Sequence, residues 1–253
     1  MEFKTLPFES PLWLPTVATT ILVGCIIIAI GLSLSNREHK VLFAKYIGLF
    51  LFARLISLHA YEVGTGDWSI YHNIPLHLCG LSSILCILIM FKYNQKMFNF
   101  LALIGIPSAI HSIITPQWMN SYEGHDFRFY EFFVSHGAIL FVPLFLMFVF
   151  GYKVSKDSAL TVFIQCVIFS IFSGAVNFIL NFDWSNFKYP VDAVGEFIHN
   201  ANYLYLCEAP DNGNPLIMTD EWPYYIPLIM FIGFLHILAF YYFFNMIKKV
   251  QND

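Results

Sequence analysis

The sequence has little charge for its length. Only 12% of its 253 residues are Asp, Glu, Lys or Arg, whereas a soluble domain usually carries about 25%. Hydrophobic residues make up 58% of the chain and aromatic residues 19%. So few charges cannot cover the surface of a soluble chain this long, which excludes an ordinary cytosolic enzyme and a disordered protein. With 13 basic against 17 acidic residues there is no basic excess, so we expect no nucleic-acid partner.

Paired cysteines and cofactor motifs are also missing. None of the five cysteines forms a C-x-x-C pair, and four of them lie inside apolar runs. This pattern excludes a disulfide framework and a zinc site, so we expect neither a metal nor another cofactor. The first apolar run lacks a basic leader and a cleavage site, which favours a membrane anchor over a signal peptide. No fixed-period repeat is visible, and we expect one transmembrane domain over residues 1–253.

In place of charge, the chain has long apolar runs. A helix of about 20 apolar residues crosses the roughly 30 Å hydrocarbon core of a bilayer. The continuous runs predict an all-α polytopic bundle with seven transmembrane helices and a long extracellular loop over residues 182–223. The predicted spans cover about residues 14–35, 41–62, 75–92, 97–115, 129–152, 159–181 and 224–247.

The basic residues predict the orientation of these spans. Eight of the 13 basic residues follow spans 1, 3, 5 and 7, on the same side of the membrane. The positive-inside rule therefore places the N-terminus outside and the C-terminus in the cytoplasm. The chain is expected to be a multi-pass protein of the cell membrane. Its richness in Phe, Ile, Asn and Lys indicates a low-GC bacterium, and hence the plasma membrane.

Polar residues inside the spans are the strongest functional signal, because ionisable groups in a bilayer are costly and usually face the bundle interior. Five consecutive spans place such residues at similar depth in the outer half, which predicts one polar chamber opening outward. Within it, Arg54 needs a partner such as a carboxylate from the outer side. His236 lies apart, and we expect it to make a structural hydrogen bond. The members of the layer are Arg54, His59, His77, Cys79, His111, His136 and Asn177.

Cys79 differs from the other cysteines because it follows Pro75, a residue suited to the first turn of a helix. A helix N-terminus stabilises the thiolate, which is the nucleophilic form of cysteine. His77 is two positions away and points elsewhere, whereas His136 and His111 lie on other spans at comparable depth. A Cys/His pair supports acyl transfer, in which the histidine removes the thiol proton and later returns one to the leaving group.

Four short motifs, in order along the chain, resemble the YwaF/TMEM164 family of integral membrane proteins. They are PLHLC at 75–79, FFVSHG at 132–137, NYLYL at 202–206 and EWPYY at 221–225. The animal branch of that family transfers fatty acyl chains between phospholipids without acyl-CoA. The resemblance therefore implies a Cys79 thioester, His136 as general acid and base, and membrane phospholipids as donor and acceptor. It gives His77 and Asn202 supporting places near the site.

The sequence departs from the family pattern in one place. Residues from Phe182 to about Asn200 form an insert rich in aromatic side chains, which suits a lid, a partner surface or a tolerated loop.

Two other functions stay open at this point. Buried Arg54, His59, His111 and His136 also suit a polar pathway in a transporter or channel. The crowding of these residues into one half of the membrane, and the absence of visible inverted repeats, count against that interpretation. A seven-span receptor or assembly factor is the third possibility, but seven spans alone indicate no signalling function.

Overall fold

The computed structural model describes residues 3–5, 12–114, 117–119, 127–192, 198, 200–209 and 218–250. Within these ranges, six helices are long and apolar enough to cross a membrane. They are α1 (Trp13–Ser33), α2 (Arg37–Thr65), the continuous segment Gln95–Ile114, α6 (Phe127–Phe150), α7 (Ser158–Asn181) and α8 (Tyr225–Val250). The chain is therefore a multi-pass helical membrane protein; its orientation in the membrane stays a prediction.

The expected span over residues 75–92 is shorter than the sequence suggested. Helix α3 covers Leu78–Phe91, and its 14 residues give a length of about 21 Å, less than the roughly 30 Å hydrocarbon core. Pro75 does not open the helix, because His77 is the N-cap with an extended backbone (φ −86°, ψ 154°). The described part of the chain thus holds six long spans and one short apolar helix instead of seven equal spans.

The fourth predicted span is one helix with a widened turn. It consists of α4 (Gln95–Phe100), a π-helical turn η1 (Leu101–Gly105) and α5 (Ile106–Ile114). Every residue of the π turn is buried. In the most apolar stretch of this segment 67% of the residues are buried, against 11% in α1 and α7 and 6% in α8. The segment Gln95–Ile114 therefore forms the centre of the bundle. Helices α1, α7 and α8 present apolar side chains to lipid.

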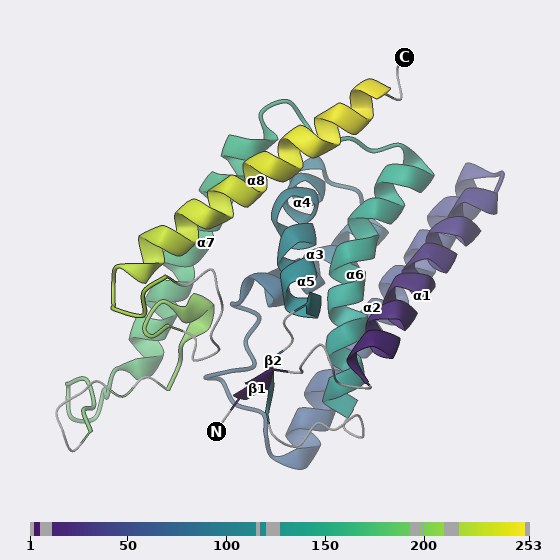
Figure 1. The fold of residues 1–253 in the computed structure, drawn as a ribbon. Helices are drawn as coiled ribbons and strands as arrows, with labels where there is room; N and C mark the ends of the chain where they lie inside the picture. The colour runs from purple at the N-terminus through teal and green to yellow at the C-terminus, as the bar shows by residue number, and fades with distance from the viewer. Residues whose placement is uncertain are drawn as a thin grey trace.

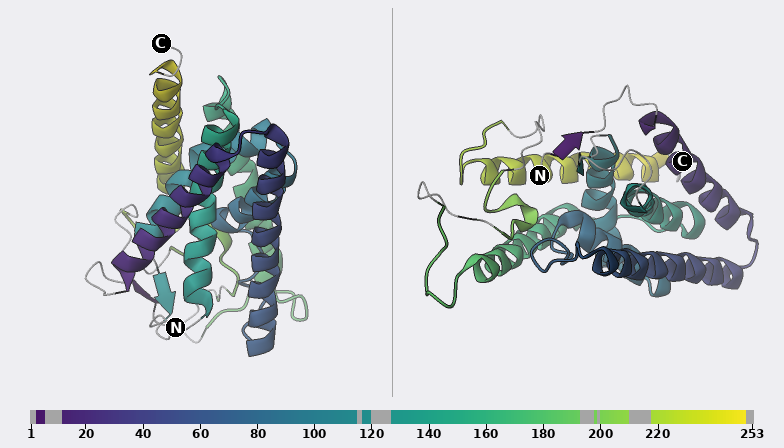
Figure 2. Two further views of the ribbon diagram at one scale, coloured as in Figure 1. Left: turned by 90° about the vertical axis from the view of Figure 1, so that its right-hand side faces the viewer. Right: turned by 90° about the horizontal axis from the view of Figure 1, so that it is seen from below.

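The helices are arranged around this centre in two groups. Figure 1 shows α1 and α2 on one side of the molecule, α7 and α8 on the other, and α3, α4 and α5 between them. The right-hand view in Figure 2 shows α1 and α7 at opposite ends of the molecule. Helix α1 packs closely on α6, because a Cβ added at Gly24 would meet the Phe141 ring at 2.3 Å. Glycine at this position lets the two backbones approach.

One detail departs from the all-α expectation. Strands β1 (Phe3–Thr5) and β2 (Gln117–Met119) pair antiparallel, with Lys4 opposite Trp118. The pair joins the start of the chain to the segment after α5 (Figure 1). It lies at the end of the bundle where α1, α3 and α6 begin and α2 and α7 end, which we call the site end.

Candidate functional site

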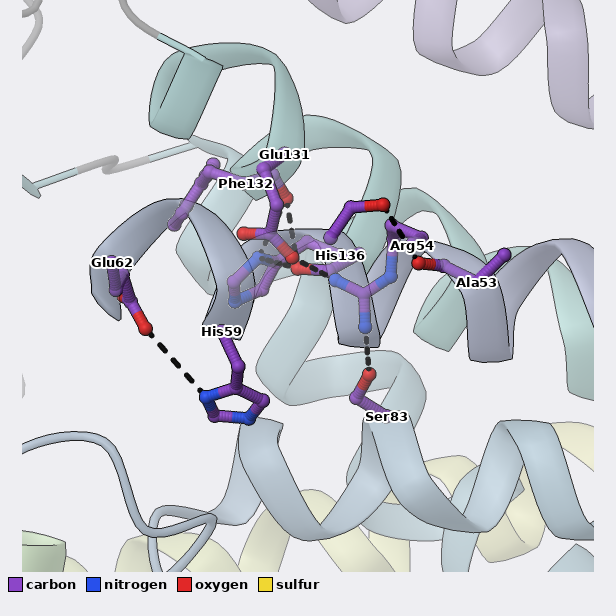
Figure 3. Close-up of polar contacts among 10 residues, drawn as sticks. Ala53, Arg54, His59, Glu62, Ser83, Glu131, Phe132 and His136 are labelled. Carbon is purple, nitrogen blue, oxygen red and sulfur yellow. Dashed lines mark hydrogen bonds and ion pairs between the residues drawn. The ribbon is translucent and has the colours of Figure 1, made fainter. Parts of the chain in front are cut away.

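Arg54 of α2 lies at the centre of a polar cluster between three helices (Figure 3). Its guanidinium pairs with the Glu131 carboxylate of α6 through Nη1. Its Nη2 donates a hydrogen bond to Ser83 Oγ of α3 at 2.6 Å. Arg54 is buried and Glu131 is only slightly exposed, with side-chain exposures of 7% and 11%. The prediction that Arg54 needs a carboxylate is confirmed, and the residue that supplies it is Glu131.

His136 of α6 lies beside this cluster and is buried. Its Nδ1 is 2.9 Å from the Phe132 carbonyl oxygen, and its ring packs on the Phe132 ring with centroids 4.0 Å apart. A carbonyl oxygen only accepts, so Nδ1 carries the proton and Nε2 presents a lone pair. Within the described residues Nε2 has no hydrogen-bond partner. Figure 3 shows the His136 ring beside the Arg54–Glu131 pair, so the structure brings these residues together.

Cys79 is the second residue of α3 and is partly exposed. Ser83 follows it by four positions, so the two side chains share one face of the helix. Further along that face, Cys86 Sγ contacts the Ala138 carbonyl of α6 at 3.7 Å. The Cys79 face of α3 is therefore turned towards α2 and α6. No hydrogen bond joins Cys79 to His136 among the described residues, and their direct pairing stays a prediction.

The other predicted residues near Cys79 hold a loop in place. This loop, residues 201–208, contains the 3-10 turn η2 (Tyr203–Tyr205). Asn177 of α7 holds Tyr203 by two hydrogen bonds of 2.9 Å, one to its carbonyl and one from its N–H. The Leu204 N–H donates to His77 Nδ1 at 3.3 Å, and Asn202 Oδ1 accepts from the Cys207 N–H at 3.0 Å. His77, Asn177 and Asn202 thus form a common scaffold.

The same loop contains two strained residues beside Cys79. Leu204 and Tyr205 adopt left-handed conformations with φ of 58° and 54°, which are costly for residues with a side chain. The Tyr225 hydroxyl donates to the Tyr205 carbonyl at 2.7 Å, and Trp222 Nε1 donates to the Leu206 carbonyl at 3.0 Å. Burial and, to a smaller extent, the Cys79 thiol raise the pKa of Tyr205, and the Tyr205 ring packs against the His77 ring with centroids 5.3 Å apart. Tyr205 belongs to the NYLYL motif, but sequence reasoning gave only Asn202 of that motif a place near the site, because the residue types do not reveal a left-handed turn.

Two predicted site residues have partners elsewhere. His59 lies near the end of α2, where Trp68 Nε1 donates to its Nδ1 at 3.2 Å and Glu62 is 3.7 Å away. His111 of α5 faces α8, with its Nε2 3.0 Å from Nε2 of His236. The prediction of structural hydrogen bonding for His236 is confirmed, since its Nδ1 also lies 2.8 Å from the Ile232 carbonyl oxygen, but the expectation that His236 lies apart from the polar layer is wrong, because His111 was assigned to that layer.

The described part of the insert begins with a small closed turn. Asp183 and Lys188 exchange two backbone hydrogen bonds of 2.9 and 3.2 Å. Hydrogen bonds from Asn186 lower the pKa of the Asp183 carboxyl. Trp184 and Phe187 are exposed on this turn. Residues 193–197 and 199 lie outside the described ranges, so the three interpretations of the insert, as a lid, a partner surface or a tolerated loop, stay predictions.

Asn177→Ala is expected to destabilise the loop 201–208. The substitution leaves the buried N–H and carbonyl of Tyr203 without partners, which costs about 2–4 kcal/mol of unfolding free energy. Thermal unfolding of the detergent-solubilised protein measures the change. Ser185→Ala in the exposed turn is the control and should stay within about 0.5 kcal/mol of the parent. Equal effects of the two variants would contradict the scaffold role of Asn177.

Comparison with known proteins gives one match. The family model of the TMEM164 family matches residues 7–242, nearly the whole chain, and so includes every residue of the cluster and the loop. No curated protein and no solved structure matched the chain. The match agrees with the motifs around Cys79, His136 and Asn202. The chain belongs to the TMEM164 family.

Proposed function

We propose that this protein is a membrane-embedded acyltransferase that moves a fatty acyl chain between phospholipids through a thioester on Cys79. The main observation that supports the proposal is the hydrogen bonding of the two ring nitrogens of His136. Its Nδ1 is engaged by the Phe132 carbonyl, which leaves Nε2 as an unpartnered base among the described residues. This base lies on α6, and the helix face that bears Cys79 is turned towards α6.

The first half of the reaction acylates the cysteine. His136 Nε2 takes the proton from the Cys79 thiol, and the thiolate adds to the ester carbonyl carbon of a donor lipid. The tetrahedral intermediate expels the lysolipid alkoxide, which takes the proton back from His136. The negative oxygen of the intermediate needs donors, and the amide groups at the N-terminus of α3 and the guanidinium of Arg54 are close to that end of the helix.

The second half transfers the acyl chain. His136 removes a proton from the hydroxyl of an acceptor lipid, and the oxygen attacks the thioester carbonyl. The Cys79 thiolate leaves and takes the proton from His136, which restores both residues. No electrons are exchanged with another compound, so the cycle balances with one donor and one acceptor.

The arrangement of polar groups favours this function over transport. The Arg54 cluster lies at the site end, and a second polar group lies towards the other end, where Asn99 donates to Ser155 Oγ at 2.8 Å. Between them the described core is apolar, with Leu101, Leu103 and Ile139 almost fully buried. Such a layer interrupts a polar pathway. A receptor or assembly role gains no specific support from the described residues.

The experiment that tests the proposal follows a labelled acyl chain. The purified protein in lipid nanodiscs is incubated with a phospholipid that is radiolabelled in its acyl chain. We expect a label on the protein that hydroxylamine releases, as a thioester requires. Cys79→Ala should abolish this label, whereas Cys25→Ala, which changes an exposed cysteine of α1, should retain it. If Cys79→Ala were labelled fully and still transferred the acyl chain at the parent rate, the covalent mechanism would be refuted.

A further inference from the structure

A groove runs along the face shared by α1, α2 and α6. It encloses about 390 Å³, within the range of about 300–1,000 Å³ that small-molecule sites occupy. None of the residues that line it carries a charge. The lining residues that the argument uses are Thr19, Val23, Phe50, Leu51, Tyr130 and Phe145.

The threonines of the groove add little polarity. The hydroxyls of Thr16, Thr19 and Thr20 each donate to the backbone carbonyl four residues earlier in α1, at 2.6, 2.7 and 2.8 Å. A hydroxyl that already donates a hydrogen bond to its own backbone needs no hydrogen-bond acceptor from a ligand. The groove therefore offers an almost wholly apolar surface.

The shape of the groove matches an extended chain. Its α6 wall runs from Tyr130 to Phe145, about 22 Å along the helix axis at 1.5 Å per residue. One leaflet contributes roughly half of the 30 Å hydrocarbon core, or about 15 Å. The groove is thus long enough for one lipid tail and runs in the direction that tails take in a bilayer.

One end of the groove meets the polar cluster of the candidate site. Phe50 and Leu51 precede Arg54 by four and three residues, so they lie one turn along the same face of α2. On α6, Glu131 lies three residues before Val134 of the lining and His136 three residues after Phe133 of the lining, so each shares a helix face with a groove residue. Arg54 Nε is a buried donor that has no acceptor among the described residues. A buried donor without an acceptor is costly, so an oxygen from a bound molecule would relieve it.

From this continuity we infer that the groove binds one acyl chain of a phospholipid, with the ester oxygens of that chain at Arg54. The inference deepens the proposed function, on which it rests for the fate of the ester. Binding of the chain can be measured without any reaction. The groove therefore supplies the acyl specificity of the site, while Cys79 and His136 supply the chemistry.

Photocrosslinking tests the inference. The protein in nanodiscs is irradiated with a phospholipid that carries a diazirine in one acyl chain, and the labelled residues are mapped by mass spectrometry. We expect labels on the groove walls in α1, α2 and α6, with competition by unlabelled phospholipid. Labelling of Ile168 and Phe172, which face outward on α7, serves as the reference for ordinary surrounding lipid.

Val23→Trp fills the groove and should reduce its labelling several-fold relative to α7. Leu22→Trp is the matched control, because Leu22 is an exposed neighbour outside the lining and should leave the labelling unchanged. Thermal unfolding confirms that both variants fold. Equal labelling of the parent, Val23→Trp and Leu22→Trp would overturn the inference and identify the groove as ordinary lipid-facing surface.

A second variant separates this result from the proposed function. Cys79→Ala should bind the chain in the groove and form no thioester. If the parent protein showed groove labelling but no thioester, the proposed acyltransferase function would be refuted. The inferred binding of an acyl chain in the groove would still hold. A thioester in the parent together with unchanged labelling in Val23→Trp would refute only the groove.

Discussion

Arg54→Met is expected to lower the free energy of unfolding by about 3–5 kcal/mol, because it leaves Glu131 as an uncompensated charge inside the bundle. The same change removes the donor to Ser83 and so loosens α3 from α2. Chemical or thermal unfolding in a fixed detergent measures the loss. A methionine keeps the length and apolar stem of the side chain, so the change reports the charge and its hydrogen bonds.

The double variant Arg54→Met/Glu131→Met tests the origin of this loss. Removing both charges should recover most of the stability, since apolar replacements of a buried pair are often neutral or stabilising. Arg128→Met is the control, because Arg128 and Asp67 form an ion pair at 3.2 Å that is far more exposed. Its effect should stay within about 1 kcal/mol. A double variant no more stable than Arg54→Met would show that the ion pair is not the cause.

His136→Ala is expected to slow acylation of Cys79 by roughly 10²–10⁴-fold, the usual contribution of a general base. Single-turnover labelling with a radiolabelled phospholipid measures the rate. His136→Asn is the sharper variant, because its amide can still donate to the Phe132 carbonyl but has no basic nitrogen. We expect its acylation to be as slow as that of the alanine variant, with better retained stability.

The control for this series is His39→Ala, which changes an exposed histidine at the opposite end of α2. It should acylate at the parent rate. Acylation of His136→Asn at the parent rate would remove His136 from the reaction and leave Cys79 in need of another base. Slow acylation in both His136 variants and in His39→Ala would instead indicate a general loss of structure.

Long apolar runs predict helices well in this chain, because length and composition decide whether a segment can cross a bilayer. A general rule also predicted that Arg54 needs a carboxylate partner, because an isolated charge in lipid is too costly. The start of α3 was less predictable. Proline favours a first helical turn in general, but here Pro75 lies in a turn closed by a hydrogen bond from the Leu76 N–H to the Ile74 carbonyl, and the helix begins only at Leu78 after the extended His77.

The backbone conformation of the loop 201–208 could not have been predicted from the sequence. Left-handed conformations usually mark glycine or asparagine, whereas here they fall on Leu204 and Tyr205. Contacts with distant helices hold them, namely Asn177 on α7 and Tyr225 on α8. The position of Tyr225 at the start of the last span predicts a residue of an interfacial aromatic belt, and this prediction is wrong, because its side chain is fully buried and donates a hydrogen bond to the loop.

The short length of α3 also sets the depth at which chemistry would occur. Lys92, the C-cap of α3, is a residue expected at the membrane–water boundary, and the helix rises only about 21 Å from it. Cys79 precedes Lys92 by 13 residues, about 20 Å along the helix axis, so in a hydrocarbon core of roughly 30 Å a helix perpendicular to the membrane would place Cys79 about 10 Å below the opposite boundary. That level is nearer to the first carbons of the lipid tails than to the headgroups. A nucleophile at this depth would select donors by the tail and its ester linkage, and would be largely indifferent to the headgroup above.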